Sequence, residues 1–285
     1  MTRRRGYVQT EAMAPLRLGI SACLLGQAVR FDGGHKRDPF LAETLGRFVE
    51  WVPVCPEVEL GLGIPREPIR LEGDPAAPRL VAVKSRRDLT RAMARLARAR
   101  AEQLARLDLV GYVLKADSPS CGMERVRVHR DRGPARRRGT GLFARTLMER
   151  LPLLPVEEEG RLRDDALRAS FIERVFAYAH WKGAVAAGMT RPRLAAFHAA
   201  HEALLRAHDP GACRRLGALV ANAGKRSLRA AVADYGAGFV AALRTQVVPT
   251  RRRAPGPPAP PAARRSPTTR PAASRPAPRR PRSSP

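Results

Sequence analysis

The stretch LRLGISAC, residues 16–23, indicates the fold of the first half of the chain. It is a short apolar run that is interrupted by Arg17 and ends at a cysteine. The arrangement recurs in WVPVC, residues 51–55, and more loosely in LVGYVL, residues 109–114, which precede Cys121 by a few positions. Short apolar runs bounded by turn residues predict buried strands, so three strands are expected to end near a cysteine.

Helical patterns separate these runs. They cover residues 38–50, 88–107 and 141–150, and further strands are predicted at 80–83 and 151–156. Strands that alternate with helices pair in parallel and carry helices on their faces. The sequence therefore predicts an α/β fold, in which an N-terminal domain, residues 16–157, has a mainly parallel sheet with flanking helices.

The composition changes after this domain. The acidic run and glycine within residues 157–163 are typical of a linker, and residues 164–245 carry apolar positions at helical spacing, which predicts a small all-α domain. Residues 250–285 are rich in Pro, Ala, Arg and Ser, so a disordered basic tail is expected. Residues 1–15 are interpreted as a basic leader, because the apolar segment before Cys23 is too short for a secretion signal.

The charge of the chain indicates a polyanionic partner. Its 285 residues include 53 Lys and Arg against 26 Asp and Glu, a formal net charge of +27. Ten arginines of residues 251–285 account for part of it and leave +17 on the remainder, a self-repulsion that favours nucleic acid as the partner, ahead of a membrane surface. The candidates for a phosphate path, unless they only form a solvated helix face, are Arg86, Arg87, Arg91, Arg95, Arg98, Arg100, Arg136, Arg137 and Arg138.

Composition also excludes two classes of protein. No stretch approaches the roughly 20 apolar residues that a membrane helix needs. Four cysteines in a chain of this length are too few for a disulfide scaffold. The expectation is a soluble protein of a reducing compartment, the cytoplasm.

Three of the four cysteines are expected to converge. Cys23, Cys55 and Cys121 each follow a predicted strand, and the carboxyl ends of parallel strands meet at one edge of a sheet. A metal site there competes with the simpler interpretation of three unrelated buried thiols. Glycines, prolines and small residues flank these cysteines, and thiolates without His ligands favour iron–sulfur chemistry over a mixed zinc site. Cys213 lies in no such motif and is expected to be a buried or incidental thiol.

Three blocks of sequence carry a specific resemblance. They are SACLLG with RFDGGHK at residues 21–26 and 30–36, VCPE at 54–57, and KADSPSCG at 115–122. In this order they resemble the thiouracil desulfidase family over residues 16–157. The region that follows, with AAFHAAHE at 195–202, resembles a helical domain that is fused to desulfidase domains in enzymes acting on 4-thiouridine in tRNA. The resemblance stops short of that domain's last helices, so a marginal or dimeric helical domain is expected.

The resemblance implies a [4Fe-4S] cluster held by the three cysteines, with one open iron that takes up the thiocarbonyl sulfur while water attacks the ring carbon. Such a reaction needs a proton donor and a base beside the thiolates. We predict Ser118 as donor or relay and Glu57 as general base, with Glu50 as a weaker substitute. The simpler interpretations are a turn-capping hydroxyl for Ser118 and a backbone-capping carboxylate for Glu57.

Polar residues on the loop after Cys23 are the predicted substrate contacts. Arg30, Asp32, His35 and Lys36 suit hydrogen bonds to a pyrimidine edge or to a nearby phosphate. The charge favours tRNA as the substrate. Two alternatives stay open: a desulfidase of free 2-thiouracil, and a non-catalytic basic nucleic-acid-binding protein in which the thiolates hold a structural metal such as zinc.

Overall fold

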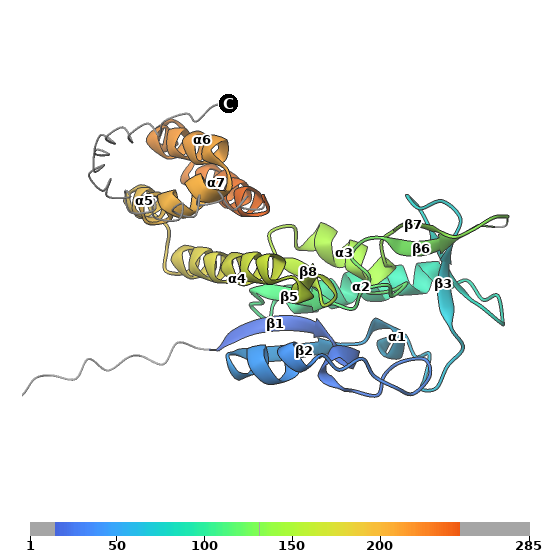
Figure 1. The fold of residues 1–285 in the computed structure, drawn as a ribbon. Helices are drawn as coiled ribbons and strands as arrows, with labels where there is room; N and C mark the ends of the chain where they lie inside the picture. The colour runs from blue at the N-terminus through green and yellow to red at the C-terminus, as the bar shows by residue number, and fades with distance from the viewer. Residues whose placement is uncertain (1–14, 131, 246–285) are drawn as a thin grey trace, which may run out of the picture. The chain divides into compact units, whose positions relative to one another are not determined.

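The computed structural model describes residues 15–130 and 132–245. The predicted leader, apart from Pro15, and the predicted basic tail lie outside the described residues. Within these two ranges, every helix is too short or too polar to cross a membrane. Figure 1 labels the main elements in chain order.

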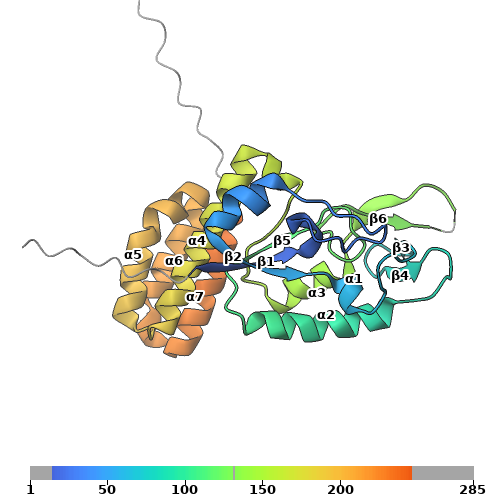
Figure 2. The ribbon, with the colours of Figure 1, turned by 90° about the horizontal axis from the view of Figure 1, so that it is seen from below.

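Four parallel strands form the first sheet, in the order β2, β1, β5, β8 (Figure 1), and Figure 2 shows the same region from below. Their bounds are Leu16–Ser21 for β1, Val49–Val54 for β2, Gly111–Leu114 for β5 and Val156–Glu158 for β8. β1 pairs with β2 on one side and with β5 on the other, so the chain first adds a strand on one side of β1 and then adds the later strands on its opposite side. Such a reversal opens a crevice at the carboxyl ends of the two central strands, where open α/β sheets bind ligands.

Helices bury both faces of this sheet. On one face, Tyr112 of β5 packs in a core with α2 (Thr90–Ala105) and α3 (Leu142–Arg150). On the other face, Leu18 and Ile20 of β1 share a core with α4 (Asp165–Ala186) and with the short turns η1 (Ala22–Leu25), η2 (Phe40–Thr44) and η3 (Leu45–Arg47). Burial on both faces explains the continuous apolar runs. The predicted α/β class with a parallel sheet and flanking helices is confirmed.

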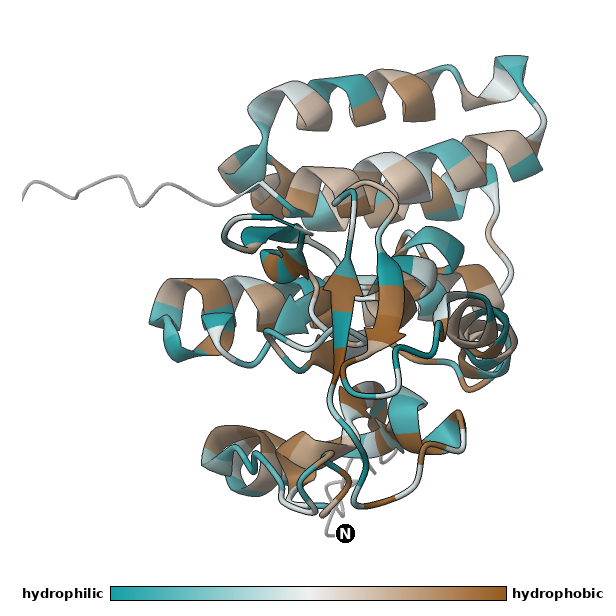
Figure 3. Cartoon of the chain, turned by 90° about the vertical axis from the view of Figure 1, so that its right-hand side faces the viewer, coloured by the Kyte–Doolittle hydropathy of each residue, from teal (hydrophilic) through white to brown (hydrophobic). Residues whose placement is uncertain are grey.

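A second sheet, in the order β4, β3, β6, β7, is predicted only in part by the sequence. Its strands are β3 (Ile69–Glu72), β4 (Arg79–Ala82), β6 (Val126–His129) and β7 (Arg136–Gly139). β3 and β6 are parallel and the outer pairs are antiparallel. Along β6 buried and more exposed residues alternate, and the same alternation of hydropathy is visible on the strands facing the viewer in Figure 3. The sequence pattern predicts only the strand at 80–83, because each strand is short and arginines occupy its outer face.

One local prediction is right only in part, and another is wrong. The predicted helix over 38–50 is helical only over residues 40–47, as the consecutive π-helix η2 and 3-10 helix η3, and β2 already begins at Val49. The predicted strand over 151–156 begins only at Val156, because the preceding residues, with two prolines, form turns.

The acidic run interpreted as a linker is the buried edge strand β8 and its continuation. Glu157, Glu158 and Glu159 are each less than 10% exposed, since each carboxylate has partners. Glu157 accepts from Arg161 and Arg174, Glu158 accepts from the Met123 N–H, and Glu159 accepts from Lys115 and the Ala116 N–H. Long-range pairing therefore makes burial of this acidic segment possible.

The remaining described residues are helical. The turn η4 (Arg161–Arg163) leads into α4, which is followed by α5 (Arg191–His208), α6 (Pro210–Ala221), η5 (Ala223–Lys225) and α7 (Leu228–Leu243). Side chains of Asp164, Thr190, Asp209 and Ser227 accept backbone N–H groups at the starts of the four α-helices. Trp181, Phe197, Tyr235 and Phe239 pack together in their core. A marginal or dimeric state of this helical region stays a prediction.

Candidate metal centre

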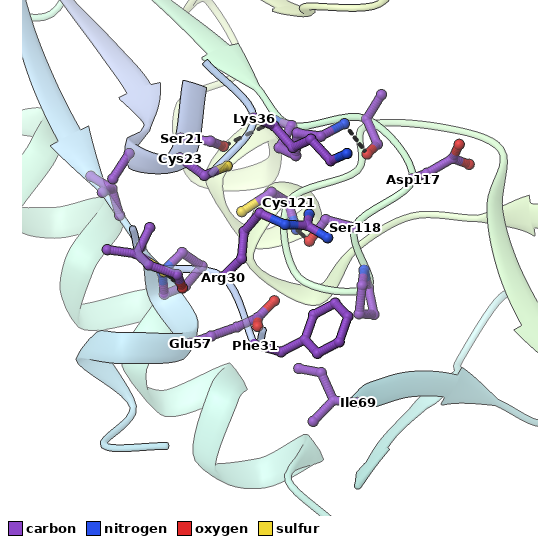
Figure 4. Close-up of a pocket in the computed structure, with 18 of the residues that line it drawn as sticks. Ser21, Cys23, Arg30, Phe31, Lys36, Glu57, Ile69, Asp117, Ser118 and Cys121 are labelled. Carbon is purple, nitrogen blue, oxygen red and sulfur yellow. Dashed lines mark hydrogen bonds between the residues drawn. The ribbon is translucent and has the colours of Figure 1, made fainter. Parts of the chain in front are cut away.

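A cavity of about 350 Å³ lies at the carboxyl ends of β1, β2 and β5. Cys23, Cys55 and Cys121 all line it, and Figure 4 shows the sulfur atoms of Cys23 and Cys121 turned toward the cavity. The structure thus brings the three cysteines together at the predicted edge of the sheet. Cys213 lies elsewhere, in the core of the helical region.

The loop that carries Cys121 is shaped by backbone contacts. It begins at Asp117, which has a left-handed backbone (φ 59°), and closes when the Gly122 N–H donates to the Ser118 carbonyl at 2.8 Å. The first N–H groups of α3 donate to the Pro119 and Ser120 carbonyls, so this loop caps a helix whose own cap, Gly141, has no side chain. A Cβ at Gly141 would lie 2.5 Å from the Ser120 backbone, which explains the glycine.

The other two cysteines sit at the starts of short helical turns. Cys23 lies in η1, and its carbonyl accepts from the Lys36 N–H, so the loop over 26–36 folds back above it. Cys55 precedes α1 (Pro56–Glu59), in which Pro56 takes the first helical position. The Cys55 Sγ also contacts the Val29 carbonyl at 3.7 Å, which joins the two loops.

Burial raises the pKa of all three thiols. It raises the pKa of Cys23 to about 11, raises that of Cys55, and holds that of Cys121 well above its ordinary value. Free thiols in this setting are protonated and weak nucleophiles. A bound metal favours the thiolate form, so the chemistry of these groups fits ligation.

The donor set fits a polynuclear cluster. Among the described residues, no group of three or more His, Cys, Asp or Glu is arranged to hold a single metal ion. An iron–sulfur cluster makes a different demand, because each cysteine binds its own iron atom. Three thiols from three separate loops around one cavity meet that demand with soft ligands.

Glu57 projects from α1 into the cavity and is fixed on both oxygens. Its Oε1 accepts from the Ser120 hydroxyl at 3.0 Å, and its Oε2 accepts from Arg66 Nη2 at 2.6 Å and Nε at 3.1 Å. Arg66 also donates to the Val29 and Gly63 carbonyls. The simpler interpretation of Glu57 as a backbone cap is therefore not what the structure shows.

Ser118 lines the cavity and also caps a turn. Its oxygen accepts the N–H groups of Ser120 at 3.3 Å and Cys121 at 3.1 Å. Since the oxygen acts as acceptor in both contacts, the hydroxyl proton remains available to a ligand. The capping role and the predicted donor role are thus compatible in one side chain.

The structure divides the predicted substrate contacts. Arg30 and Lys36 line the cavity, whereas Asp32 and His35 do not. Asp32 is exposed and accepts from the Gly34 N–H, and His35 accepts from the backbone of the same loop. Both side chains are exposed and bond to nearby backbone N–H groups, so they are not among the cavity contacts.

Glu50, the substitute base, is also remote from the thiols. It lies near the amino end of β2, pairs with Arg17 at 2.8 Å and does not line the cavity. Five residue steps of about 3.3 Å each lie between it and Cys55 along the strand, so it cannot replace Glu57.

Three further residues of the cavity wall are absent from the predicted site. Arg66 has no motif around it, and its role depends on folding of the 60–68 segment against Phe31, so no local signal would have found it. Phe31 and Lys115 lie inside the recognised blocks. Lys115 is already paired with Glu159, while the Phe31 ring stacks under the Arg30 guanidinium at 5.3 Å.

These features define a metal-binding α/β protein with a carboxylate and a hydroxyl beside three thiols. Residues 18–159 match the family model described as 2-thiouracil desulfurase. A solved structure of a "[4Fe-4S]-dependent thiouracil desulfidase TudS" is 32% identical, over 54% of this chain and 98% of that chain, with a TM-score of 0.45. No curated protein matches the chain. The chain belongs to the 2-thiouracil desulfurase family.

Proposed function

We propose that this protein is an iron–sulfur-dependent desulfidase that exchanges the sulfur of a thiolated uracil for oxygen, with 4-thiouridine in tRNA as its substrate. The observation that carries the proposal is the convergence of the three thiols with Glu57 and Ser118 on one cavity. Family membership and the 32% sequence identity to a thiouracil desulfidase support the reaction class.

Cys23, Cys55 and Cys121 would hold a [4Fe-4S] cluster. Three ligands leave one iron open, and this group would supply a thiophilic Lewis acid for the thiocarbonyl sulfur. Persistent thiolate ligation also suits the reducing cytoplasm, which forms part of the proposal.

The chain's own groups then move protons. Glu57, oriented by Arg66 and Ser120, accepts a proton from the water that attacks the ring carbon. Ser118 passes its hydroxyl proton toward the departing sulfur and is reprotonated from solvent, and the hydroxyl added to the ring carbon loses its remaining proton as the carbonyl forms. The C–S bond breaks, a C–O bond forms and sulfide leaves, so the exchange is a hydrolysis without net electron transfer.

Arg30, Phe31 and Lys36 form the substrate side of the cavity in this proposal. The half-exposed Phe31 ring offers an apolar face on which a pyrimidine can stack. Lys36 and Arg30 supply cationic donors for a uracil oxygen or a phosphate. The net charge of +27 supports an RNA substrate over a free base.

Anaerobic purification tests the proposal. Iron, acid-labile sulfide and loss of the thiouridine absorbance of tRNA are measured, with free 2-thiouracil as a second substrate. Cys121→Ala is expected to lose the cluster and turnover, while the matched control Cys213→Ala keeps both. A colourless protein that leaves both substrates intact contradicts the proposal. Bound zinc with salt-sensitive RNA binding and no turnover would establish the structural-metal alternative.

A further inference from the structure

The outer face of the second sheet is crowded with arginines. We define the arginine face as Arg70 on β3, Arg79 on β4, Arg86 in the following turn, Arg127 on β6 and Arg137 on β7. The inner face of the same strands carries Leu71 and Val128 in the core. Since neighbouring residues of a strand alternate between faces, the arginines point away from the core.

A buried carboxylate organises three of these arginines. Glu72 is 7% exposed in its side chain; Arg86 donates to both of its oxygens, at 2.6 and 2.8 Å, and Arg70 donates to Oε1 at 2.7 Å. Arg79 lies 3.9 Å from Oε2. Arg86 also holds a left-handed backbone (φ 60°), an arrangement that L residues with side chains rarely adopt. One negative charge thus fixes three positive ones.

The other two arginines stand directly opposite each other. Arg127 pairs in register with Arg137 across β6 and β7, although like charges at opposed positions destabilise a sheet. Arg137 has an acceptor in Asp117 at 3.2 Å, while Arg127 has no hydrogen-bond or ion-pair partner among the described residues. Burial and the charges of Arg70 and Arg127 lower the pKa of the neighbouring His129. Folding alone gives no reason for this charge density.

The arginine face meets the cavity wall through one ion pair. Asp117, which pairs with Arg137, lines the cavity and precedes Ser118 (Figure 4). The arginines of the arginine face and those of α2, the other candidate phosphate path, do not line the cavity themselves; the ion pair of Arg100 on α2 is with Glu59, which lies outside the cavity wall. Positive side chains next to the cavity can bind the phosphates of an RNA while one of its bases enters the cavity.

We propose that the arginine face binds the sugar–phosphate backbone of the RNA next to the thiolated nucleotide. The inference rests on the proposed function and adds the surface that selects RNA over a free base. Its five arginines against Glu72 and Asp117 leave an excess of three positive charges. Strands about 4.8 Å apart set guanidinium groups in a row, and such groups bind phosphates in bidentate pairs.

Arg127→Glu in the cluster-containing full chain tests this inference. The matched control is Arg95→Glu, which makes the same charge change at an exposed position of α2. Binding of labelled tRNA is measured by fluorescence anisotropy against salt, and turnover is measured with thiolated tRNA and with 2-thiouracil.

For Arg127→Glu we expect a roughly 10- to 50-fold loss in tRNA affinity and in kcat/KM for thiolated tRNA at 0.15 M salt. The slope of the logarithm of the tRNA association constant against the logarithm of the salt concentration should become smaller in magnitude by about one to two. Turnover of 2-thiouracil and the melting temperature should not fall. An unchanged tRNA affinity, or an equal loss in Arg95→Glu, overturns the inference. Wild-type protein that binds tRNA through Arg127 but turns over neither substrate instead contradicts the proposed function.

Discussion

Replacing Arg66 by methionine is expected to lower the stability of the chain and the turnover that depends on Glu57. The Arg66 side chain is 5% exposed and its partner Glu57 is 14% exposed, so the pair is largely shielded from water. Arg66→Met keeps an unbranched apolar stem but removes the guanidinium group, so it leaves the Glu57 carboxylate without a counter-ion. Breaking such a buried pair from one side costs about 3 kcal/mol, and the Val29 and Gly63 carbonyls lose their donor as well.

Thermal unfolding of the full chain measures the first consequence. A loss of about 3 kcal/mol corresponds to a melting temperature lower by roughly 6–12 °C for a chain of this size. Steady-state turnover of 2-thiouracil measures the second. Because Arg66 is paired with Glu57, whereas the proposed substrate contacts are Arg30, Phe31 and Lys36, we expect kcat to fall while KM changes little.

A double-mutant cycle separates positioning from simple structural support. If Arg66 acts through Glu57, the double variant Arg66→Met with Glu57→Gln should lose no more kcat than Glu57→Gln alone. Arg66→Lys restores the charge without the two-pronged contact and should recover part of the stability. Additive losses in kcat, or wild-type melting of Arg66→Met, would refute this reasoning.

Three further outcomes follow from contacts described above. The pKa of Glu72 is lowered to about 2, chiefly by its hydrogen bond with Arg86, so the ionised carboxylate stabilises the fold above its ordinary pKa and this stabilisation disappears as the pH falls toward 2. Glu72→Gln should therefore lower the free energy of unfolding by up to about 3 kcal/mol at pH 7, measured by urea unfolding, and the difference from wild type should shrink below about pH 4.5. Gly19→Ala would place a Cβ 2.1 Å from the Tyr112 ring, so it should lower the melting temperature of the chain, whereas Ala at the open position Gly183 should not. Gly141→Ala would collide with the Ser120 backbone, and we expect less iron per chain in anaerobic reconstitution; wild-type loading would contradict the role given to this glycine.

Local sequence pattern predicts the parts of the fold that are buried on both faces. β1 and β5 are of this kind, so their apolar runs predict strands, and their parallel pairing predicts that the cysteines meet. The second sheet escapes prediction because strands of four residues with exposed arginines carry little periodic signal. The carboxylates of β8 escape it because their partners, such as Lys115 and Arg174, are distant in the sequence.

The site shows the same division. Cys23, Cys55 and Cys121 are predicted from strand ends and motifs, which are readable along the chain. Arg66 reaches Glu57 only after the intervening loop folds, and Asp32 is exposed and bonds to the Gly34 N–H of its own loop. Strand ends and motifs therefore identify the three cavity cysteines better than they identify the polar side chains around them.

Burial of the acidic strand β8 bears on how this protein can be divided or recombined. The family match ends at residue 159, within the continuation of this strand, yet Glu157 depends on Arg174 of α4, and Phe171 and Val175 of the same helix complete the core over β1. Ending the chain at residue 159 would leave the buried Glu157 carboxylate without its partner Arg174 and would expose an apolar face of the sheet. The segment that matches the family therefore ends near residue 159, whereas the packing contacts of its sheet continue into α4.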